Sequence, residues 1–473
     1  MTINLLPDDV LLIIFHFIRV TYLDGPGNVY VWHPYWWHRL IHVCQRWRSA
    51  VFAWPNFMDL KLVCRPWSRR ELIGIWPPLP IVIMNVVYVT LPKDYGFDAV
   101  VLHRKRVCEI HLLGLKSPQL QQLVSAMQGQ FPALIHLRLG FSRHGPAPDL
   151  PDGFLGGSAP HLQSLELRSI PFPALPTLLL SATHLVRLTL RDIPHSGYIP
   201  PEVIVAGLAA LSNLKFLTIG FESTLSRPDE ESQQPPPPNP TCVLPALTRF
   251  EFKGVSTYLE ELVAQTDAPL LGSIQISLFD RLVSDFPQLT RLMRHATRFR
   301  APNEVHVDVD HSGIQVTSLS PRGGLDKEFK LEIFCRMLDW ELSPLARRVF
   351  VSFLPSIYMV NHLYIYWTQF FPLQWQDDDV YMEWLEILQP FTSVKDLYVC
   401  KELAKCFALA LKDLVGERVT DVLPALECLL LEELQPSGVI QETIEPFVAA
   451  RQLLGNPVAV SCWDRTGEHH YYG

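Results

Sequence analysis

The sequence has 473 residues, of which 48% are hydrophobic and 19% charged, so it can bury a large core and is not globally disordered. The formal net charge of −8 argues against a general nucleic-acid binder, which needs Lys and Arg to neutralise phosphates. The nine cysteines form no Cys-x-x-Cys pair, which favours a reducing compartment over a disulfide framework. No apolar run reaches the ~18–20 residues of a membrane span, and we expect a soluble protein of the cytoplasm, the nucleus or both.

The first predicted element is a helix that starts at Pro7. Proline suits the first helical turn because it lacks an N–H, and Asp8 and Asp9 complement the positive end of the helix dipole. From Val10 onward, apolar residues recur at helical spacing and form one stripe: Leu11, Ile14, Phe15 and Ile18. Further apolar residues widen this stripe around the helix: Leu12, Ile13 and Phe17. A helix that is apolar on more than one side is usually buried by more than its own domain.

A second helical segment is predicted over residues 40–51. Its apolar residues lie at helical spacing with arginines on the other side: Leu40, Val43, Cys44, Trp47 and Val51 against Arg39, Arg46 and Arg48. We therefore interpret residues 1–62 as a small helical module built to be covered by a partner.

These two segments carry a family resemblance. Residues 6–15 (LPDDVLLIIF) and 40–48 (LIHVCQRWR), continued by 49–55 (SAVFAWP), resemble the F-box, especially its members in mushroom-forming fungi. The resemblance implies a three-helix module that docks on the Skp adaptor of SCF-type cullin–RING ubiquitin ligases. One departure is an insertion at residues 21–35 (TYLDGPGNVYVWHPY), which is longer than the family usually has. The resemblance implies the following adaptor-binding residues: Leu6, Pro7, Val10, Leu11, Ile14, Phe15, Leu40, Val43, Cys44 and Trp47.

Residues 63–105 are expected to connect this module to the rest of the chain. Near their end lies a short basic run at 102–106 (LHRKR), which we interpret as a solvated loop. Beyond it, over residues 106–460, short apolar alternations recur. Their first apolar residues lie 23 to 29 residues apart, enough for one strand and one return segment per unit: Ile110, Leu137, Leu165, Leu188 and Leu217.

Several of these units open with a proline at the same offset, as in residues 132–134 (PAL). Proline there ends the preceding helix and fixes the entry to the strand. The pattern resembles an irregular leucine-rich repeat, in the arrangement where an F-box precedes a repeat domain. The Asn or Cys that normally turns the chain after each strand is mostly absent.

The sequence therefore predicts an α/β chain with a small N-terminal helical F-box and an irregular leucine-rich-repeat solenoid. Parallel strands would form its inner face, with helices and loops outside. An α/β domain with ordinary parallel strands is the alternative. In the solenoid, the alternating apolar residues should point into the core: Ile110, Leu112, Leu137, Leu139, Leu165, Leu167, Leu188 and Leu190.

Two segments interrupt or close the array. Residues 226–241, which include Pro235 to Pro238, are predicted to be a disordered insertion that acts as a spacer, with an SH3-type ligand as the alternative. Residues 444–453 predict a helix that closes the array, and residues 461–473 form a C-terminal tail. This helix is similar to the tail of the same fungal F-box proteins.

The sequence contains no nucleophile elbow, phosphate-binding loop or dinucleotide-binding turn. The weak metal candidates are interpreted as ordinary surface or loop residues: His38 with His42, Cys462 with His469 and His470, and Asp377 to Asp379. The nearby Trp32, Trp36 and Trp37 are interpreted as packing of the insertion, with a protein contact as the alternative. We therefore expect no enzymatic activity, no cofactor and no metal.

The leading functional hypothesis is a substrate-receptor subunit of an SCF-type ubiquitin ligase. It would bind the Skp adaptor and, through it, the cullin and RING subunits, and would hold an unknown protein substrate, with no nucleic-acid or membrane partner. The alternative is a non-catalytic, non-degradative leucine-rich-repeat scaffold, and an undetected hydrolase is the third possibility. The candidate substrate face is the row of side chains between the buried strand positions: His111, Arg138, Glu166, Thr189, Thr218, Glu251, Gln275 and His306.

Overall fold

The computed structural model describes residues 6–23, 36–55, 57–64, 77–85, 97, 102–142, 145, 147–223, 242–279, 286–296, 303–310, 313–319, 329–334, 359–367, 380–412, 414, 416–432 and 438–463. It forms two compact units, Met1–Tyr198 (unit 1) and Ile199–Gly473 (unit 2). Residues 24–35 of the predicted insertion, the predicted spacer at 226–241, and the acidic run at Asp377 to Asp379 lie outside the described residues. So do Trp32, His469 and His470.

Unit 1 begins with three helices, α1 (Asp8–Leu23), α2 (His38–Ile41) and α3 (Gln45–Ala53). The amide of Leu11 donates to the carbonyl of Pro7 at 3.1 Å, so the first helical turn forms around the proline as predicted. Leu11 and Phe15 from α1 are fully buried, and the ring of Phe15 packs 4.8 Å from that of Trp47 on α3. The side chain of Arg46 pairs with Asp8 at 2.7 Å and ties α3 to the start of α1.

The single helical segment predicted over residues 40–51 is wrong in one respect, because the structure breaks it into α2 and α3. Cys44 between them is extended, with φ −159° and ψ 169°. Its Sγ accepts a hydrogen bond from the amide of Trp47 at 3.5 Å, so Cys44 is the N-cap of α3. The break separates the predicted apolar stripe: Leu40 is buried, whereas Val43 is exposed.

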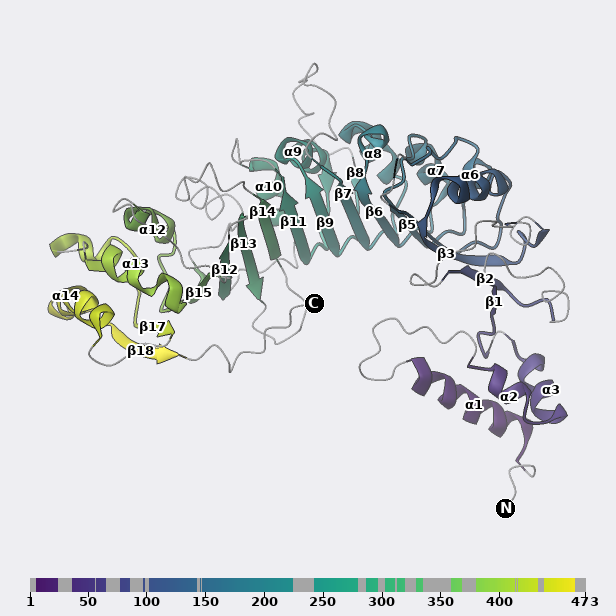
Figure 1. Cartoon of the computed structure of the whole chain (residues 1–473), viewed down its shortest axis with the longest axis horizontal. Helices are drawn as coiled ribbons and strands as arrows, with labels where there is room; N and C mark the ends of the chain where they lie inside the picture. The colour runs from purple at the N-terminus through teal and green to yellow at the C-terminus, as the bar shows by residue number, and fades with distance from the viewer. Residues whose placement is uncertain are drawn as a thin grey trace. The chain divides into compact units, whose positions relative to one another are not determined.

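The rest of unit 1 is a parallel sheet whose strands follow chain order. These strands are β1 (Leu62–Cys64), β2 (Ile81–Met84), β3 (Val107–Leu115), β4 (His136–Phe141), β5 (Ser164–Arg168) and β6 (Arg187–Ile193). Return segments run between the later strands: α6 (Ser117–Ala126), η2 (Phe154–Gly157) and α7 (Leu175–Ser181), while η3 (His195–Gly197) follows β6. Helices α6 and α7 lie along one side of the strands (Figure 1). One strand and one return per repeat is the architecture of a leucine-rich-repeat-like solenoid.

The core of this sheet is the row of apolar residues that alternation predicted. All eight predicted core positions from Ile110 to Leu190 are at most 5% exposed. Adjacent strands place them side by side, since Leu137 pairs with Ile110 and Leu165, and Leu165 pairs with Leu188. Burying one such side chain contributes about 1.5–3 kcal/mol, so the repeats stabilise one another through contiguous leucine layers.

Each unit has a strand that lies wholly or partly beyond the predicted solenoid boundaries of 106 and 460. Strand β2 lies wholly inside the predicted connecting segment 63–105, and β18 (Ala459–Trp463) runs into the predicted tail. Residues 81–84 (IVIM) form an unbroken apolar run, of which Ile81, Val82 and Ile83 are buried. A parallel strand covered on both faces lacks the alternation on which the boundary was based.

Unit 2 starts in the same way. Strands β7 (Phe216–Phe221), β9 (Arg249–Gly254) and β11 (Ser273–Leu278) pair in parallel and in order. Helices α8 (Pro201–Leu208), α9 (Ser256–Ala264) and α10 (Pro287–His295) lie on one side of them (Figure 1). A small second sheet joins β8 (Cys242–Val243) to β10 (Thr266–Asp267).

The prediction of uniformly parallel strands fails after β11. Strands β12 (Glu304–Asp310), β13 (Gly313–Leu319) and β14 (Phe329–Phe334) enter the sheet in the order β11-β14-β13-β12-β15, and β13 is antiparallel to both of its neighbours. Only two residues, His311 and Ser312, separate β12 from β13. A parallel crossover needs a dozen or more residues, so this connection can only make a hairpin.

The parallel order resumes with β15 (His362–Trp367), β16 (Asp396–Val399), β17 (Cys428–Glu432) and β18. Between or beside them lie α12 (Val380–Leu388), α13 (Lys401–Lys412), η7 (Gly416–Thr420) and α14 (Val439–Leu453). Helix α14 contains the predicted closing helix at 444–453 and starts five residues earlier. No described helix has the length and apolar character needed to cross a membrane.

Polar side chains connect neighbouring repeats by hydrogen bonds in two ways: from residues directly after a strand, and from arginines that donate to the preceding repeat. Asn85, directly after β2, bonds the Leu113 backbone twice, at 2.7 Å to its carbonyl and 2.9 Å from its amide. Cys400, directly after β16, accepts from the amide of Trp367 at 3.2 Å. The Asn or Cys expected after a repeat strand is therefore present at these two places. Arg106, Arg291 and Arg451 each donate to backbone carbonyls about one repeat earlier in the chain.

Candidate functional site

The predicted substrate row exists in unit 1 as a set of side chains in strand register. His111 pairs with Arg138, Arg138 with Glu166, and Glu166 with Thr189 on consecutive parallel strands. Their neighbours in sequence are the buried leucines, so the four side chains share the opposite face of the sheet. Arg138 is exposed and Thr189 is buried, so the open part of the row lies over β3 to β5.

In unit 2 the row also holds its register, with an order that the sequence did not predict. Thr218 pairs with Glu251, and Glu251 with Gln275. The hairpin then inserts Lys330 and Thr317 before His306 is reached. Two more residues extend the row beyond His306: Tyr364 and Tyr398.

Sequence reasoning missed Lys330, Thr317, Tyr364 and Tyr398 as members of the row. Tyr364 and Tyr398 occupy the same place in the alternation as the predicted members, in residues 362–365 (HLYI) and 396–399 (DLYV), and that pattern was the available signal. In residues 330–333 (KLEI) the same place belongs to Glu332, so the alternation does not indicate Lys330. Thr317 lies on the antiparallel strand, and nothing in the repeat spacing indicates which neighbours it meets.

The charged side chains on this face are already paired with one another. Arg138 Nε lies 2.9 Å from Glu166 Oε2, and Arg168 Nε lies 2.9 Å from Asp192 Oδ2. In unit 2, Arg249 Nε lies 3.0 Å from Glu251 Oε1. The other carboxylate oxygen, Glu251 Oε2, accepts a hydrogen bond from the Thr218 hydroxyl at 3.2 Å. The pairing orients these groups before any ligand arrives, and the mixed signs suit a protein surface rather than a phosphate backbone.

The most deeply placed charge on this side of unit 1 is Glu109. Burial of its carboxyl opposes ionisation, but hydrogen bonds from His111 and Lys61, both at 2.9 Å, outweigh that effect and lower the pKa from 4.5 to about 2. Burial, together with the nearby cationic groups of His111, Lys61 and Arg187, lowers the pKa of the neighbouring His136 imidazole, although the Glu109 carboxylate opposes this. The Glu109 carboxylate therefore links β3 to Lys61, which directly precedes β1, and its two oxygens are already paired with Lys61 and His111.

The C-terminal part of the row is aromatic and closed. The ring of Tyr364 stacks on His306 at 4.4 Å and on Tyr398 at 4.1 Å. Trp463 of β18 meets Tyr398 edge-on at 5.6 Å, and its indole N–H donates to the carbonyl of Val399 at 3.2 Å. Tyr364 is only 7% exposed and Tyr366 1%, so these side chains serve packing rather than contact with a ligand.

The ten predicted adaptor residues divide by burial. Leu11, Phe15 and Leu40 are buried and form the interior of the helical module, so they cannot touch a docked partner in this conformation. The half-buried members are Leu6, Val10, Ile14 and Trp47, and the exposed members are Pro7, Val43 and Cys44.

Other apolar side chains of the same region, outside the predicted set, are also exposed. Ile13 is 52% exposed and Phe17 65%, four residues apart on α1 and therefore on one side of it. Trp54 and Phe57, beyond α3, are also exposed. The signal for Ile13 and Phe17 was present in the sequence as apolar residues outside the main stripe, of which Leu11 and Phe15 form the interior and Ile14 and Ile18 are half-buried.

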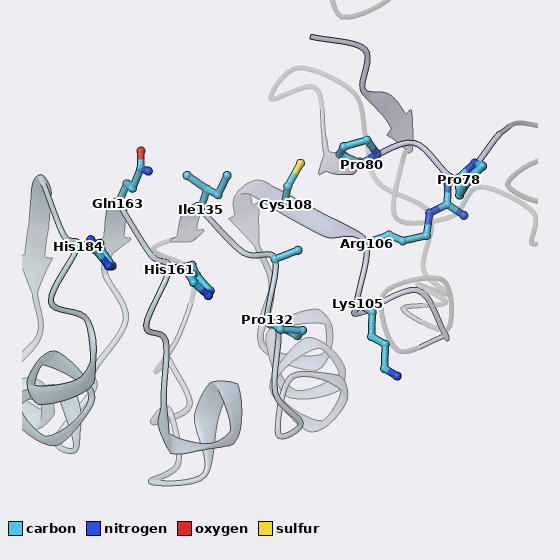
Figure 2. Close-up of a pocket in the computed structure, with 11 residues that line it drawn as sticks. Pro78, Pro80, Lys105, Arg106, Cys108, Pro132, Ile135, His161, Gln163 and His184 are labelled. Atoms are coloured by element: carbon cyan, nitrogen blue, oxygen red, sulfur yellow. The ribbon is translucent and has the colours of Figure 1, made fainter. Parts of the chain in front are cut away.

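A pocket of about 670 Å³ opens in unit 1 where the chain enters strands β3 to β6 (Figure 2). Cations and imidazoles contribute to its wall just before the strands begin: Lys105 and Arg106 before β3, His161 before β5, and His184 before β6. Pro80, Pro132 and Ile135 supply apolar surface, and Gln163 adds an amide. Lys105 and Arg106 belong to the basic run that the sequence predicted to be only a solvated loop.

The described residues contain no group of three or more His, Cys, Asp or Glu side chains that could hold a metal ion. Burial raises the pKa of the thiols of Cys64, Cys108 and Cys242 to about 11 and that of Cys400 to about 12, which keeps each in the unreactive thiol form at neutral pH. The arrangement on these strands is one of paired surface charges, which can recognise a partner.

No protein-family model and no curated protein matches this sequence. Among solved structures, the chain is similar to a leucine-rich repeat-containing protein, LegL7 from Legionella pneumophila, at 12% sequence identity with a TM-score of 0.30. The match covers 81% of this chain and 92% of that one. The chain's own strand register, with one strand and one return per repeat, defines its leucine-rich-repeat-like fold.

Proposed function

We propose that this chain is a substrate-receptor subunit of an SCF-type cullin–RING ubiquitin ligase. The N-terminal module binds the Skp adaptor, and the solenoid binds a protein substrate. The observation that carries the proposal is the coincidence of an F-box-like sequence at residues 6–15 and 40–48 with exposed apolar side chains on the same helices. A small module that leaves Ile13, Phe17 and Val43 in water gains stability when a partner covers them.

The receptor itself performs no chemistry in this proposal. It holds a substrate near the ubiquitin-conjugating enzyme, so that the transfer gains from effective concentration and orientation. The in-register polar row over β3 to β5 and over β7 to β11 supports a protein ligand, because its charges are oriented and of both signs. No step requires a cofactor or a metal.

The test is co-purification of the full chain with the Skp adaptor and the cullin from cells of the source organism. Ile13→Asp combined with Phe17→Asp places two charges on the exposed face without entering the module's interior. We expect this variant to lose the adaptor at least about tenfold, because large apolar anchors often contribute 2 kcal/mol or more. Leu180→Asp on α7 is the matched control, because Leu180 is equally exposed and lies in the repeats.

The outcomes separate the candidate functions. Wild-type protein that captures no adaptor would remove the ligase proposal. Capture of the adaptor without the cullin would favour the non-degradative scaffold. Equal capture by wild type and by the Ile13/Phe17 variant would place the adaptor elsewhere on the chain, and turnover of any substrate by the purified chain alone would favour an enzyme.

A further inference from the structure

The pocket at the entry to strands β3 to β6 combines positive charge with a lining that contains no acidic side chain. On the strand row, Arg138 and Arg168 each lie 2.9 Å from a carboxylate. By contrast, none of the described residues that line the pocket is an Asp or Glu. Charge in a hollow with apolar walls acts on a ligand more strongly than the same charge on an open surface.

Arg106 is held in place at one end of the pocket. Its Nε donates to the carbonyl of Leu79 at 3.0 Å, and one terminal nitrogen donates to Leu79 at 2.8 Å and to Pro77 at 3.2 Å. Carbonyl groups orient the guanidinium but do not cancel its charge. Lys105, the residue before Arg106, is exposed at the rim and adds a second cation on a flexible side chain.

Two imidazoles form the other end. His161 and His184 occupy the same position in successive repeats, one residue before the buried Leu162 and Leu185. Their rings are nearly parallel, 8° apart with centroids 6.4 Å from one another, and both lie on the same side of the sheet entry (Figure 2). Imidazole N–H groups donate to anions, and the flat rings offer surface to an extended chain.

The stretch between these two ends is apolar. Pro80, Pro132 and Ile135 line it, with the Gln163 amide nearby. The cavity of about 670 Å³ falls in the range of sites that hold a few residues of a peptide. A ligand that fits all three parts has an anionic group beside small or branched apolar side chains.

We propose that this pocket binds an extended peptide through an anionic side chain, a carboxylate or a phosphate, with adjacent apolar residues against Pro80, Pro132 and Ile135. The proposal rests on the proposed function and gives its substrate a class: a protein with an exposed acidic-apolar segment. It also adds a second contact region to the predicted row, at the ends where the strands begin.

The experiment is selection of a random dodecapeptide library on the immobilised full chain. The double variant Lys105→Glu, His184→Glu serves as the counter-selection, and Arg104→Glu serves as the matched control, because Arg104 is an exposed member of the same basic run that does not line the pocket. We expect acidic residues next to apolar ones in peptides that the wild type and Arg104→Glu retain and the double variant loses.

The selected peptides are then measured by fluorescence anisotropy with the acidic residue replaced by Gln or by phosphoserine. We expect the Gln form and the double variant each to weaken binding about tenfold or more, as charge-assisted hydrogen bonds are lost. A tighter phosphoserine form identifies phosphate as the preferred anion, and a weaker one identifies carboxylate. Recovery of no peptides, no acidic enrichment, or equal loss with Arg104→Glu would overturn the proposal.

Capture of the Skp adaptor by the same variants distinguishes this proposal from the proposed function. The substituted side chains are exposed and do not belong to α1, α2 or α3, so adaptor capture should be unchanged. Normal adaptor capture with unaltered peptide binding overturns only the pocket. Failure of the wild type to capture adaptor removes the ligase and leaves the peptide site to be judged by its own result.

Discussion

The strand rows of the two units use the same register position for different purposes. In unit 1 the side chains between buried leucines form ion pairs such as Arg138 with Glu166 and remain partly in water. In unit 2 the corresponding positions on β12, β15 and β16 stack His306, Tyr364 and Tyr398 under Trp463. Alternation along a strand therefore identifies which residues share a face of the sheet, but not whether that face is exposed to solvent.

The largest effect should appear when the aromatic part of the unit 2 row loses the indole ring that packs against it. Trp463→Ala removes a buried ring that meets three tyrosines, and we expect it to cost about 3–5 kcal/mol of the free energy of unfolding of unit 2. Urea denaturation followed by amide exchange of β15 to β17 measures this loss. A cost below about 1 kcal/mol would show that the aromatic part is as loosely packed as an open surface.

The next effect is the pH dependence of the Glu109 network in unit 1. The pKa of Glu109 is lowered from 4.5 to about 2, so its ionised form stabilises unit 1 above pH 4.5. That stabilisation is lost as the pH falls from 4.5 through about 2 and amounts to about 3 kcal/mol at most. Glu109→Gln should remove this pH dependence, as measured by amide exchange of β3 between pH 5 and pH 2. An unchanged slope in the variant would contradict the pairing with Lys61 and His111.

We expect a smaller effect from removing Asn85 or Cys400, the two side chains that form hydrogen bonds to a neighbouring repeat directly after a strand. Asn85→Ala deletes two hydrogen bonds to the Leu113 backbone, and we expect it to cost about 2 kcal/mol in unit 1. Cys400→Ala deletes one weaker sulfur contact to Trp367 and should cost about 1 kcal/mol or less in unit 2. Thermal unfolding of the two variants checks the order, and a larger loss for Cys400→Ala would reverse it.

The smallest effect on stability separates recognition from folding. Arg138→Gln breaks a partly exposed ion pair and should change the free energy of unfolding by less than about 1 kcal/mol. If the row holds a protein substrate, the same change should lower substrate capture severalfold, as measured by quantitative mass spectrometry with the proteasome inhibited. Thr257→Val, on helix α9 and away from the row, is the control. An unchanged set of captured proteins would argue that unit 1 binds its substrate elsewhere.

Much of the fold could be predicted from the sequence because its strands alternate apolar and polar residues at a repeating interval. The eight predicted core residues between Ile110 and Leu190 are buried, as the alternation predicted. The polar residues between them, His111, Arg138, Glu166 and Thr189, are in register. The hairpin of β12 and β13 could not be predicted, because repeat spacing says nothing of strand direction. Strand β2 was missed because it is buried on both faces and has no alternation.

The candidate sites were harder to predict than the fold. On α1, an apolar stripe at helical spacing identifies a buried face, and Leu11 and Phe15 are indeed buried. Ile13 and Phe17, outside that stripe, are the exposed apolar side chains on which the adaptor proposal rests. The pocket depends on His161 and His184, which are adjacent only because two repeats stack. This proximity follows from the register of the strands, and the sequence of either repeat alone does not predict it.

The most direct test of the ligase proposal is the affinity of the purified full chain for the purified Skp adaptor, measured by isothermal titration calorimetry. We expect a one-to-one complex with a negative heat-capacity change, because apolar surface is buried. The affinity should fall at least about tenfold for Ile13→Asp with Phe17→Asp and stay unchanged for Leu180→Asp. No binding by the wild type, or equal binding by all three proteins, would contradict it.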